Sequence, residues 1–267
     1  MSGNTKTLRT RIKSVNSTLQ LTNAMGLVAS SKIRKANATM LKSREYKVAL
    51  KKSLSTLASA RECAKSPFLS EREGNRQKII IIAGDRGLAG GYNANVFRIA
   101  KEYPNADFVP IGKKACEKFG KPILSAEKFS FDDAYRMAKE LIEEFLKDKF
   151  DKLGIISTEY HSIMSQEAVI EWVLPFEKGE DTSGDGMIFE PDSLTVLNNI
   201  ATEYIAGVIT VAVRESFASE VSARRMAMDS AGKNAKQMIS DLQVEYNRAR
   251  QGAITQEITE IVAGSGN

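Results

Sequence analysis

The sequence is poor in the residues that most often carry enzyme chemistry and metal binding. Its 267 residues include a single histidine, His161, and two cysteines, Cys63 and Cys116. No Ser–His–Asp or Cys–His set is evident around that histidine. The cysteines have no CxxC spacing, which favours reduced thiols over a disulfide or a metal site. We therefore expect no catalytic residues, no metal, no cofactor and no enzyme that acts alone.

Long hydrophobic runs are also missing. The most apolar segment, Tyr204 to Val213, spans ten residues, whereas a helix needs about 20 to cross a bilayer. The N-terminus has no apolar stretch of the kind that signal peptides carry. We expect a chain that lies outside the bilayer and reaches a membrane only through a partner.

Proline is absent from Asp192 to Val262, although the chain contains six prolines. Because proline interrupts helices, this stretch predicts one nearly unbroken helix, about 105 Å long at 1.5 Å per residue. Pro191 cannot lie inside a helix, whereas Asp192 or Ser193 can cap one. An isolated helix of this length is not stabilised by propensity alone, so it needs a partner along much of its length.

The first 60 residues supply a second long helix, with Asn4 or Thr5 as its N-cap. Apolar and small residues recur there in alternating steps of four and three, which is a heptad seam. The middle of this seam is small, so another backbone can approach closely. The seam positions are Leu8, Ile12, Val15, Leu19, Thr22, Gly26, Ala29, Ile33, Ala36, Met40, Ser43, Lys47, Leu50, Leu54 and Leu57.

Charge is distributed unevenly along the chain. Residues 1–60 hold twelve Lys/Arg and one acid, Glu45, for a net charge of +11; the remainder has 26 basic and 32 acidic residues, for −6. A basic helix of this kind suits either nucleic acid or an acidic protein surface. A nucleic-acid arm would not need an apolar seam, so the seam favours one strand of a coiled coil.

The C-terminal helix repeats the pattern of small and apolar residues. Both seams are therefore suited to two helices wound tightly around each other. A folded segment separates them, so they pair antiparallel most simply. The predicted seam positions of this helix are Met228, Ala231, Ala235, Met238, Leu242 and Ala249.

The middle of the chain alternates strands and helices. KIIIIAG, starting at Lys78, is a β-branched run typical of a buried strand. Three further strands are predicted at 107–112, in LGIIST and, at an edge, in VIEWVLPF. The alternation indicates a small Rossmann-like α/β domain with a largely parallel sheet. We therefore predict an α/β fold: a long antiparallel coiled coil of 1–62 and 191–267, with a central α/β domain at 75–190.

The glycine-rich stretch GDRGLAGG (84–91) follows the first predicted strand. Such a turn can cradle a phosphate at a helix N-terminus. It lacks GK[ST], however, and matches GxGxxG imperfectly. The favoured interpretation is a tight turn from which Arg86 reaches a partner protein. The alternative is a nucleotide-binding α/β protein with a coiled-coil stalk.

Four stretches resemble the gamma subunit of F-type ATP synthase over nearly the whole chain. They are LTNAMGLVASSKIRKA, GDRGLAGGYN, FEPD and YNRARQGAITQEITEIVAGS. The resemblance implies a non-catalytic rotor that transmits torque between a proton-driven c-ring and a ring of three alpha and three beta subunits. It also implies contact with epsilon and a peripheral place on the cytoplasmic face of a bacterial plasma membrane, with no nucleic acid as a partner.

The resemblance also assigns roles to individual positions. Met25 faces an acidic loop of beta, with an acid and an arginine on the opposing helix at that level. Phe189 and Glu190 lie at the foot, near epsilon and the c-ring. Contacts with the catalytic subunits are expected at Met25, Asp85, Arg86, Glu220, Arg224, Arg250, Gln251, Thr255 and Glu257.

Three positions depart from the family pattern. Asn23 replaces the usual lysine, which implies weaker or rearranged contacts with beta there. Gly26 replaces the usual glutamate after Met25. Gly264 is followed by Ser265 where the family ordinarily has alanine.

Overall fold

A computed structural model describes residues 2–60, 63, 65–70, 72–177 and 190–264. The element order is α–β–α–β–α–α–β–β–α. The chain divides into two compact units, one made of Met1–Ser30 and Arg224–Asn267, the other of Ser31–Ala223. Both long helices contribute to both units. The three-part division at 1–62, 75–190 and 191–267 stays a prediction.

The first helix, α1 (Ser2–Ala58), confirms the predicted seam. Every predicted seam position is half-buried or buried, from Leu8 to Leu57, while most intervening residues are exposed. Burial deepens from Thr22 onward, where the seam residues are small. The spacing of small and apolar residues therefore decides which face of α1 packs.

The last helix, α5 (Ser193–Gly264), runs for 72 residues. Asp192 caps it, because its carboxylate accepts hydrogen bonds from the Thr195 N–H at 2.8 Å and from the Thr195 hydroxyl at 2.7 Å. Hydrogen bonds from the backbone and side chain of Thr195 lower the pKa of Asp192. The start of this helix was therefore predicted correctly.

Two predicted seam positions of α5 are one residue off register: Ala231 stands next to the buried Gly232, and Met238 next to Ile239. Met238 is 44 % exposed, whereas the neighbouring Ile239 is half-buried. The observed seam keeps strict steps of four and three, and Met238 falls one residue off that register. Its positions are Met228, Gly232, Ala235, Ile239, Leu242, Tyr246, Ala249 and Ala253.

The two long helices pair antiparallel in each unit. In the first unit, the Arg225 guanidinium donates to the Ser30 hydroxyl at 2.6 Å, and a Cβ on Gly232 would lie 3.8 Å from Thr22 Oγ1. In the second unit, Arg214 donates to the Ser43 hydroxyl at 2.8 Å, and Gly207 lies against the side chain of Leu50. Rising numbers on α1 therefore meet falling numbers on α5, as the seams predicted.

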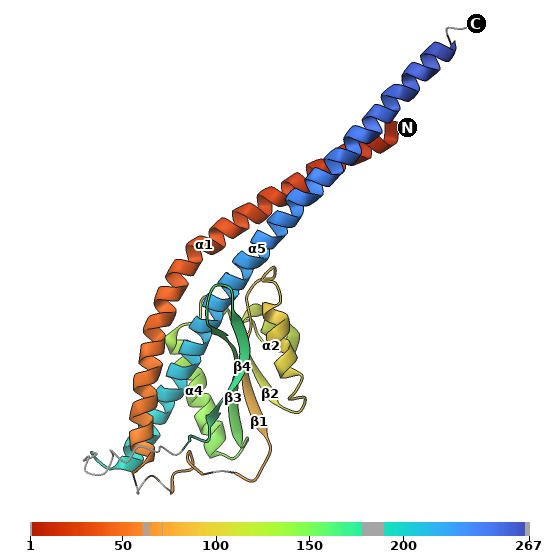
Figure 1. The fold of residues 1–267 in the computed structure, drawn as a ribbon. Helices are drawn as coiled ribbons and strands as arrows, with labels where there is room; N and C mark the ends of the chain where they lie inside the picture. The colour runs from red at the N-terminus through yellow and green to blue at the C-terminus, as the bar shows by residue number, and fades with distance from the viewer. Residues whose placement is uncertain (1, 61–62, 64, 71, 178–189, 265–267) are drawn as a thin grey trace. The chain divides into compact units, whose positions relative to one another are not determined.

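The second unit contains a four-stranded sheet in the order β2-β1-β3-β4 (Figure 1). β1 (Gln77–Ile82) pairs in parallel with β2 (Asp107–Ile111) and with β3 (Lys152–Tyr160). β4 (Gln166–Leu174) pairs antiparallel with β3 at the other edge. Pro110 has no N–H to donate, which suits the position of β2 at an edge. The predicted largely parallel sheet with a fourth edge strand is confirmed.

Helices cover both faces of this sheet, which makes three layers. On one face, α2 (Tyr92–Ala100) and α3 (Lys113–Phe119) pack against Ile79 and Ile81. On the other face, α4 (Phe131–Leu146), the end of α1 and the first turns of α5 pack against Ile80 and Ile82. Alternate residues of β1 thus enter opposite cores, because successive strand side chains point to opposite faces.

The hydropathy of α5 has a structural explanation. The helix contains an 18-residue window apolar enough, by length and composition, to cross a membrane, although the sequence has no unbroken apolar run of that length. Of this window, 67 % is buried inside the protein. Ile205, Val208 and Ile209 belong to the core under the sheet, so the apolar character of this segment serves packing.

Gly112 is the glycine on which the sheet edge depends most. Its φ is +95°, and an added Cβ would lie 1.9 Å from the carbonyl oxygen of Ala83. We expect Gly112→Ala to lower the free energy of unfolding by about 3 kcal/mol or more, through backbone strain and steric overlap. Urea unfolding followed by circular dichroism measures this.

Gly252 provides the matched control. It lies within α5 with nothing within 4 Å of an added Cβ. Gly252→Ala should leave stability unchanged or raise it by about 1 kcal/mol, because alanine favours a helix interior. Equal stability of the two variants would contradict the strain at Gly112.

Candidate functional site

The turn after β1 is built around the carboxylate of Asp85. Asp85 Oδ1 accepts from the backbone N–H groups of Lys113 and Ala126, each at 3.0 Å. Asp85 Oδ2 accepts from the Glu127 N–H at 3.0 Å and from the Ser125 hydroxyl at 2.6 Å. One side chain thus joins the end of β1 to the start of α3 and to the segment before α4.

These hydrogen bonds also set the charge of the carboxylate. Burial alone would raise the pKa of Asp85, but the hydrogen bonds from Ser125, Glu127, Lys113 and Ala126 outweigh it and lower the pKa below its ordinary value of 3.8. Donors that point at a carboxylate stabilise its ionised form. Asp85 therefore stays negative at neutral pH.

A second carboxylate lies at the same turn. Glu220 of α5 is only 3 % exposed, and a Cβ on Gly84 would be 2.8 Å from its Cδ. Position 84 therefore favours glycine, because the Glu220 side chain occupies the space that a larger side chain would need. The N–H of Gly84 donates to Asn93 Oδ1 at 2.9 Å.

This arrangement argues against phosphate binding at the glycine-rich turn. Two carboxylates, Asp85 and Glu220, lie where a phosphate cradle would need donors and positive charge. The backbone donors at 113, 126 and 127 already bond to Asp85. The favoured interpretation of the sequence, a tight turn, fits the structure better than a nucleotide site.

Arg86 and Leu88 form the outward side of this turn. The Arg86 side chain is 68 % exposed, and its guanidinium lies 3.8 Å from a carboxylate oxygen of Glu127. Leu88 is 64 % exposed and has a φ of 60°, which is rare for a branched residue. An exposed arginine on a fixed turn suits a protein contact surface, because arginine is enriched at such surfaces.

The first unit contains Met25 and Arg224, whereas Glu220 belongs to the second. Met25 and Arg224 are both half-buried. A Cβ on the neighbouring Gly26 would lie 3.7 Å from the Cβ of Met228, so the two helices approach closely here. Arg225, which the sequence did not single out, bridges to Ser30 of α1.

The end of α5 carries the other predicted contact residues. Arg250, Gln251, Thr255 and Glu257 are all exposed. The Thr255 hydroxyl donates to the Gln251 carbonyl of its own helix at 3.0 Å. These side chains are therefore available to a partner.

An apolar stripe at the same end was missed by the sequence reasoning. Ile254, Ile258, Ile261 and Val262 are 48 %, 57 %, 69 % and 65 % exposed. Their spacing of four, three and one residues places them on one helix face. That spacing was the available signal, because an exposed apolar face marks an interaction surface.

The register in which α1 and α5 pair explains why this stripe is exposed. Ser30 meets Arg225 and Thr22 meets Gly232. Continued residue for residue, this register brings Ser2, the start of α1, opposite Gly252. The turns of α5 beyond Gly252 therefore extend past α1.

The predicted foot is only partly described. Glu190 is exposed next to the Asp192 cap. Phe189 lies outside the described residues. In the part of the chain that the structure describes, no group of three or more His, Cys, Asp or Glu side chains could hold a metal ion. Cys63 and Cys116 are both buried, and no disulfide joins them.

These features define a coiled-coil protein with an inserted α/β domain. The profile of a family described as ATP synthase matches residues 4–266. The ATP synthase gamma chain of Stenotrophomonas maltophilia is 38 % identical, over 97 % of each chain. That of Ruminococcus albus is 39 % identical, over 99 % of this chain and 98 % of the relative.

Solved structures share the fold. A chain of the Euglena gracilis mitochondrial ATP synthase rotor has a TM-score of 0.66 at 20 % identity, covering 95 % of this chain and all of that one. A chain of the Tetrahymena thermophila central stalk and c-ring has a TM-score of 0.65 at 20 % identity, covering 79 % and 99 %. The chain belongs to the ATP synthase gamma-chain family.

Replacing Asp85 by asparagine tests the role of its carboxylate. The amide would turn N–H groups toward backbone donors, so Asp85→Asn should cost about 1–3 kcal/mol of stability at pH 7. Because folding lowers the pKa of Asp85, its stabilisation is present above the unfolded pKa and disappears as pH falls through the folded pKa. The difference from wild type should therefore shrink below about pH 4.

The measurement is urea unfolding of both proteins from pH 7 down to pH 3. Glu140→Gln, on the exposed face of α4, is the control and should change stability by less than about 0.5 kcal/mol. A cost for Asp85→Asn that stays constant across this range would contradict the charge-based explanation.

Proposed function

We propose that the chain is the central-stalk rotor subunit of an F-type ATP synthase. It transmits torque between a proton-driven c-ring and a catalytic ring of three alpha and three beta subunits. The observation that carries this proposal is the end of α5, which runs beyond its partner helix and presents an exposed apolar stripe. Family membership supports it independently.

The apolar stripe would lie inside the catalytic ring, together with Arg250, Gln251, Thr255 and Glu257. The apolar face of α5 could rotate against the surrounding subunits with little preference for one angle, because the hydrophobic effect is non-directional. The polar side chains around it would make contacts that differ with rotation angle. Such contacts bias which beta conformation is populated at each angle.

Charge would orient the shaft. The +11 of residues 1–60 complements acidic loops of the catalytic subunits, which favours one docking geometry over others. Met25 and Arg224 in one unit, and Glu220, Asp85 and Arg86 in the other, are the proposed contacts at the base of the ring. Glu220 is buried, so its role would be to hold the turn that presents Arg86.

The foot would couple the chain to the membrane part of the complex. We assign Phe189 and Glu190 to contacts with epsilon and the c-ring. The chain would take no part in covalent chemistry, and its place would be peripheral, on the cytoplasmic face of a bacterial plasma membrane.

Reconstitution tests the function. The isolated chain should hydrolyse no ATP, and mixing it with alpha and beta subunits should assemble a complex that hydrolyses ATP. Replacing Ile254 and Ile258 by aspartate should weaken assembly about tenfold, because the interface would lose two isoleucine side chains that assembly buries. Co-purification at graded concentrations measures the change.

The control for that variant is Gln256→Asp, which adds charge on the opposite face of the same exposed turns. It should assemble within about twofold of wild type. Both variants should fold, since these side chains are exposed. Unimpaired assembly of the double isoleucine variant would contradict the placement of the stripe inside the ring.

A lysine at Met25 tests the contact with beta. Met25→Lys would add a cation next to acidic loops and strengthen that contact in one rotational state, so it should impair rotation and lower proton pumping per ATP. Proton uptake into vesicles, divided by ATP hydrolysed, measures coupling. Met25→Leu conserves volume without charge and should pump like wild type. Equal coupling in both variants would count against the placement of Met25.

A further inference from the structure

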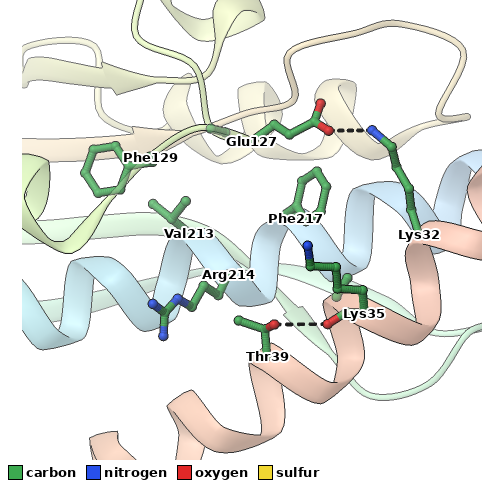
Figure 2. Close-up of a pocket in the computed structure, with 10 residues that line it drawn as sticks. Lys32, Lys35, Thr39, Glu127, Phe129, Val213, Arg214 and Phe217 are labelled. Atoms are coloured by element: carbon green, nitrogen blue, oxygen red, sulfur yellow. Dashed lines mark hydrogen bonds and ion pairs between the residues drawn. The ribbon is translucent and has the colours of Figure 1, made fainter.

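A pocket of about 370 Å³ lies within the second unit, between α1, α5 and the segment that precedes α4 (Figure 2). Its interior is apolar, with Ala36, Ala126 and Val213 almost fully buried. Two half-buried rings, Phe129 and Phe217, form its walls. The volume falls within the range of small-molecule sites, which are mostly apolar with a few convergent polar groups.

The charged groups around this pocket are predominantly positive. Lys32, Lys35 and Arg214 line it, against a single acid, Glu127. Lys32 forms an ion pair with Glu127, as Figure 2 shows. The charge on the lining side chains is therefore +2.

Two of the cations keep binding capacity. The Arg214 guanidinium donates one N–H to the Ser43 hydroxyl, a neutral partner, and so retains further donors. Lys35 is exposed, and no acidic partner for it is found among the residues that the structure describes. A cation beside an apolar cavity is stabilised by an anion that brings its own apolar body.

We propose that this pocket binds an amphipathic anion, with a flat or short apolar body between Phe129 and Phe217 and a single anionic head group at Lys35. Neither the apolar walls nor the cations alone would select amphipathic anions over other small molecules. A neutral apolar molecule would leave the cations unmatched. A small inorganic anion would leave the apolar walls in contact with water.

Glu127 limits the affinity of this site. Its carboxylate neutralises Lys32 and repels an incoming anion. Replacing it by glutamine would free Lys32 and raise the charge of the lining from +2 to +3. The proposal therefore predicts a variant that binds an anionic ligand more tightly than wild type and a neutral ligand equally well, a difference that a loosened core would not produce.

The experiment uses the full-length chain and two dyes. 8-Anilinonaphthalene-1-sulfonate is an aromatic anion, and N-phenyl-1-naphthylamine has the same rings without the sulfonate. Fluorescence titrations at low salt give the Kd of each. Wild type should bind the anionic dye at least about tenfold more tightly than the neutral one, as expected of a charge-assisted contact.

Four variants locate the site. Lys35→Glu should weaken binding of the anionic dye about tenfold or more, and Glu127→Gln should tighten it about threefold or more. Thr39→Trp, which places a large ring at a lining position, should block both dyes at this site. Lys51→Glu, an equal charge change on an exposed position of α1 away from the pocket, should leave both affinities unchanged.

Three outcomes would overturn the proposal. One is equal loss of binding in Lys35→Glu and Lys51→Glu, which would indicate a general charge effect. Another is retention of full anionic-dye binding in Thr39→Trp, which would place the dye elsewhere, for example on the apolar stripe of α5. The third is a parallel change for both dyes in Glu127→Gln, which would indicate a loosened core.

Discussion

The pairing of two long helices through a seam of small residues is the constraint on which the rest of this structure depends. A 72-residue helix cannot bury its own apolar face, and intrinsic propensity alone does not keep it folded. Gly26, Thr22 and Gly232 let the backbones of α1 and α5 approach until their Cβ positions are in van der Waals contact. The same closeness fixes the register, and the register determines how much of α5 is left without a partner.

The α/β domain is attached to this helix pair through α5 as well as through connecting segments. The apolar residues in the N-terminal turns of α5 pack against one face of the sheet. Glu220, further along α5, contacts the turn after β1. Asp85 then joins that turn to α3 and to the segment before α4. Within the second unit, movement of α5 would therefore displace the turn that presents Arg86, which is the mechanical property a rotor domain needs.

Much of this fold could be predicted because its signals are local. The absence of proline after Pro191 and the capping ability of Asp192 determine where α5 begins, and the strands are short apolar runs bounded by glycine or proline. The seam of α1 was predictable at every position because its heptads are regular. On α5, neighbouring small or apolar residues compete for the seam at two places, so Ala231 was chosen over Gly232 and Met238 over Ile239, and only packing distinguishes them.

The site was less predictable, because its geometry joins residues far apart in the chain. The glycine-rich turn resembles a phosphate cradle until Glu220 is placed against Gly84 from 136 positions further along the chain. The pocket lined by Lys35, Glu127 and Phe217 draws on three segments with no shared motif. In both cases the chemistry of the site depends on side chains that are far apart in the sequence, so no local motif reveals it. The bare end of α5 is the converse: its stripe was visible in the spacing of Ile254, Ile258 and Ile261, but only the register shows that α1 stops short of it.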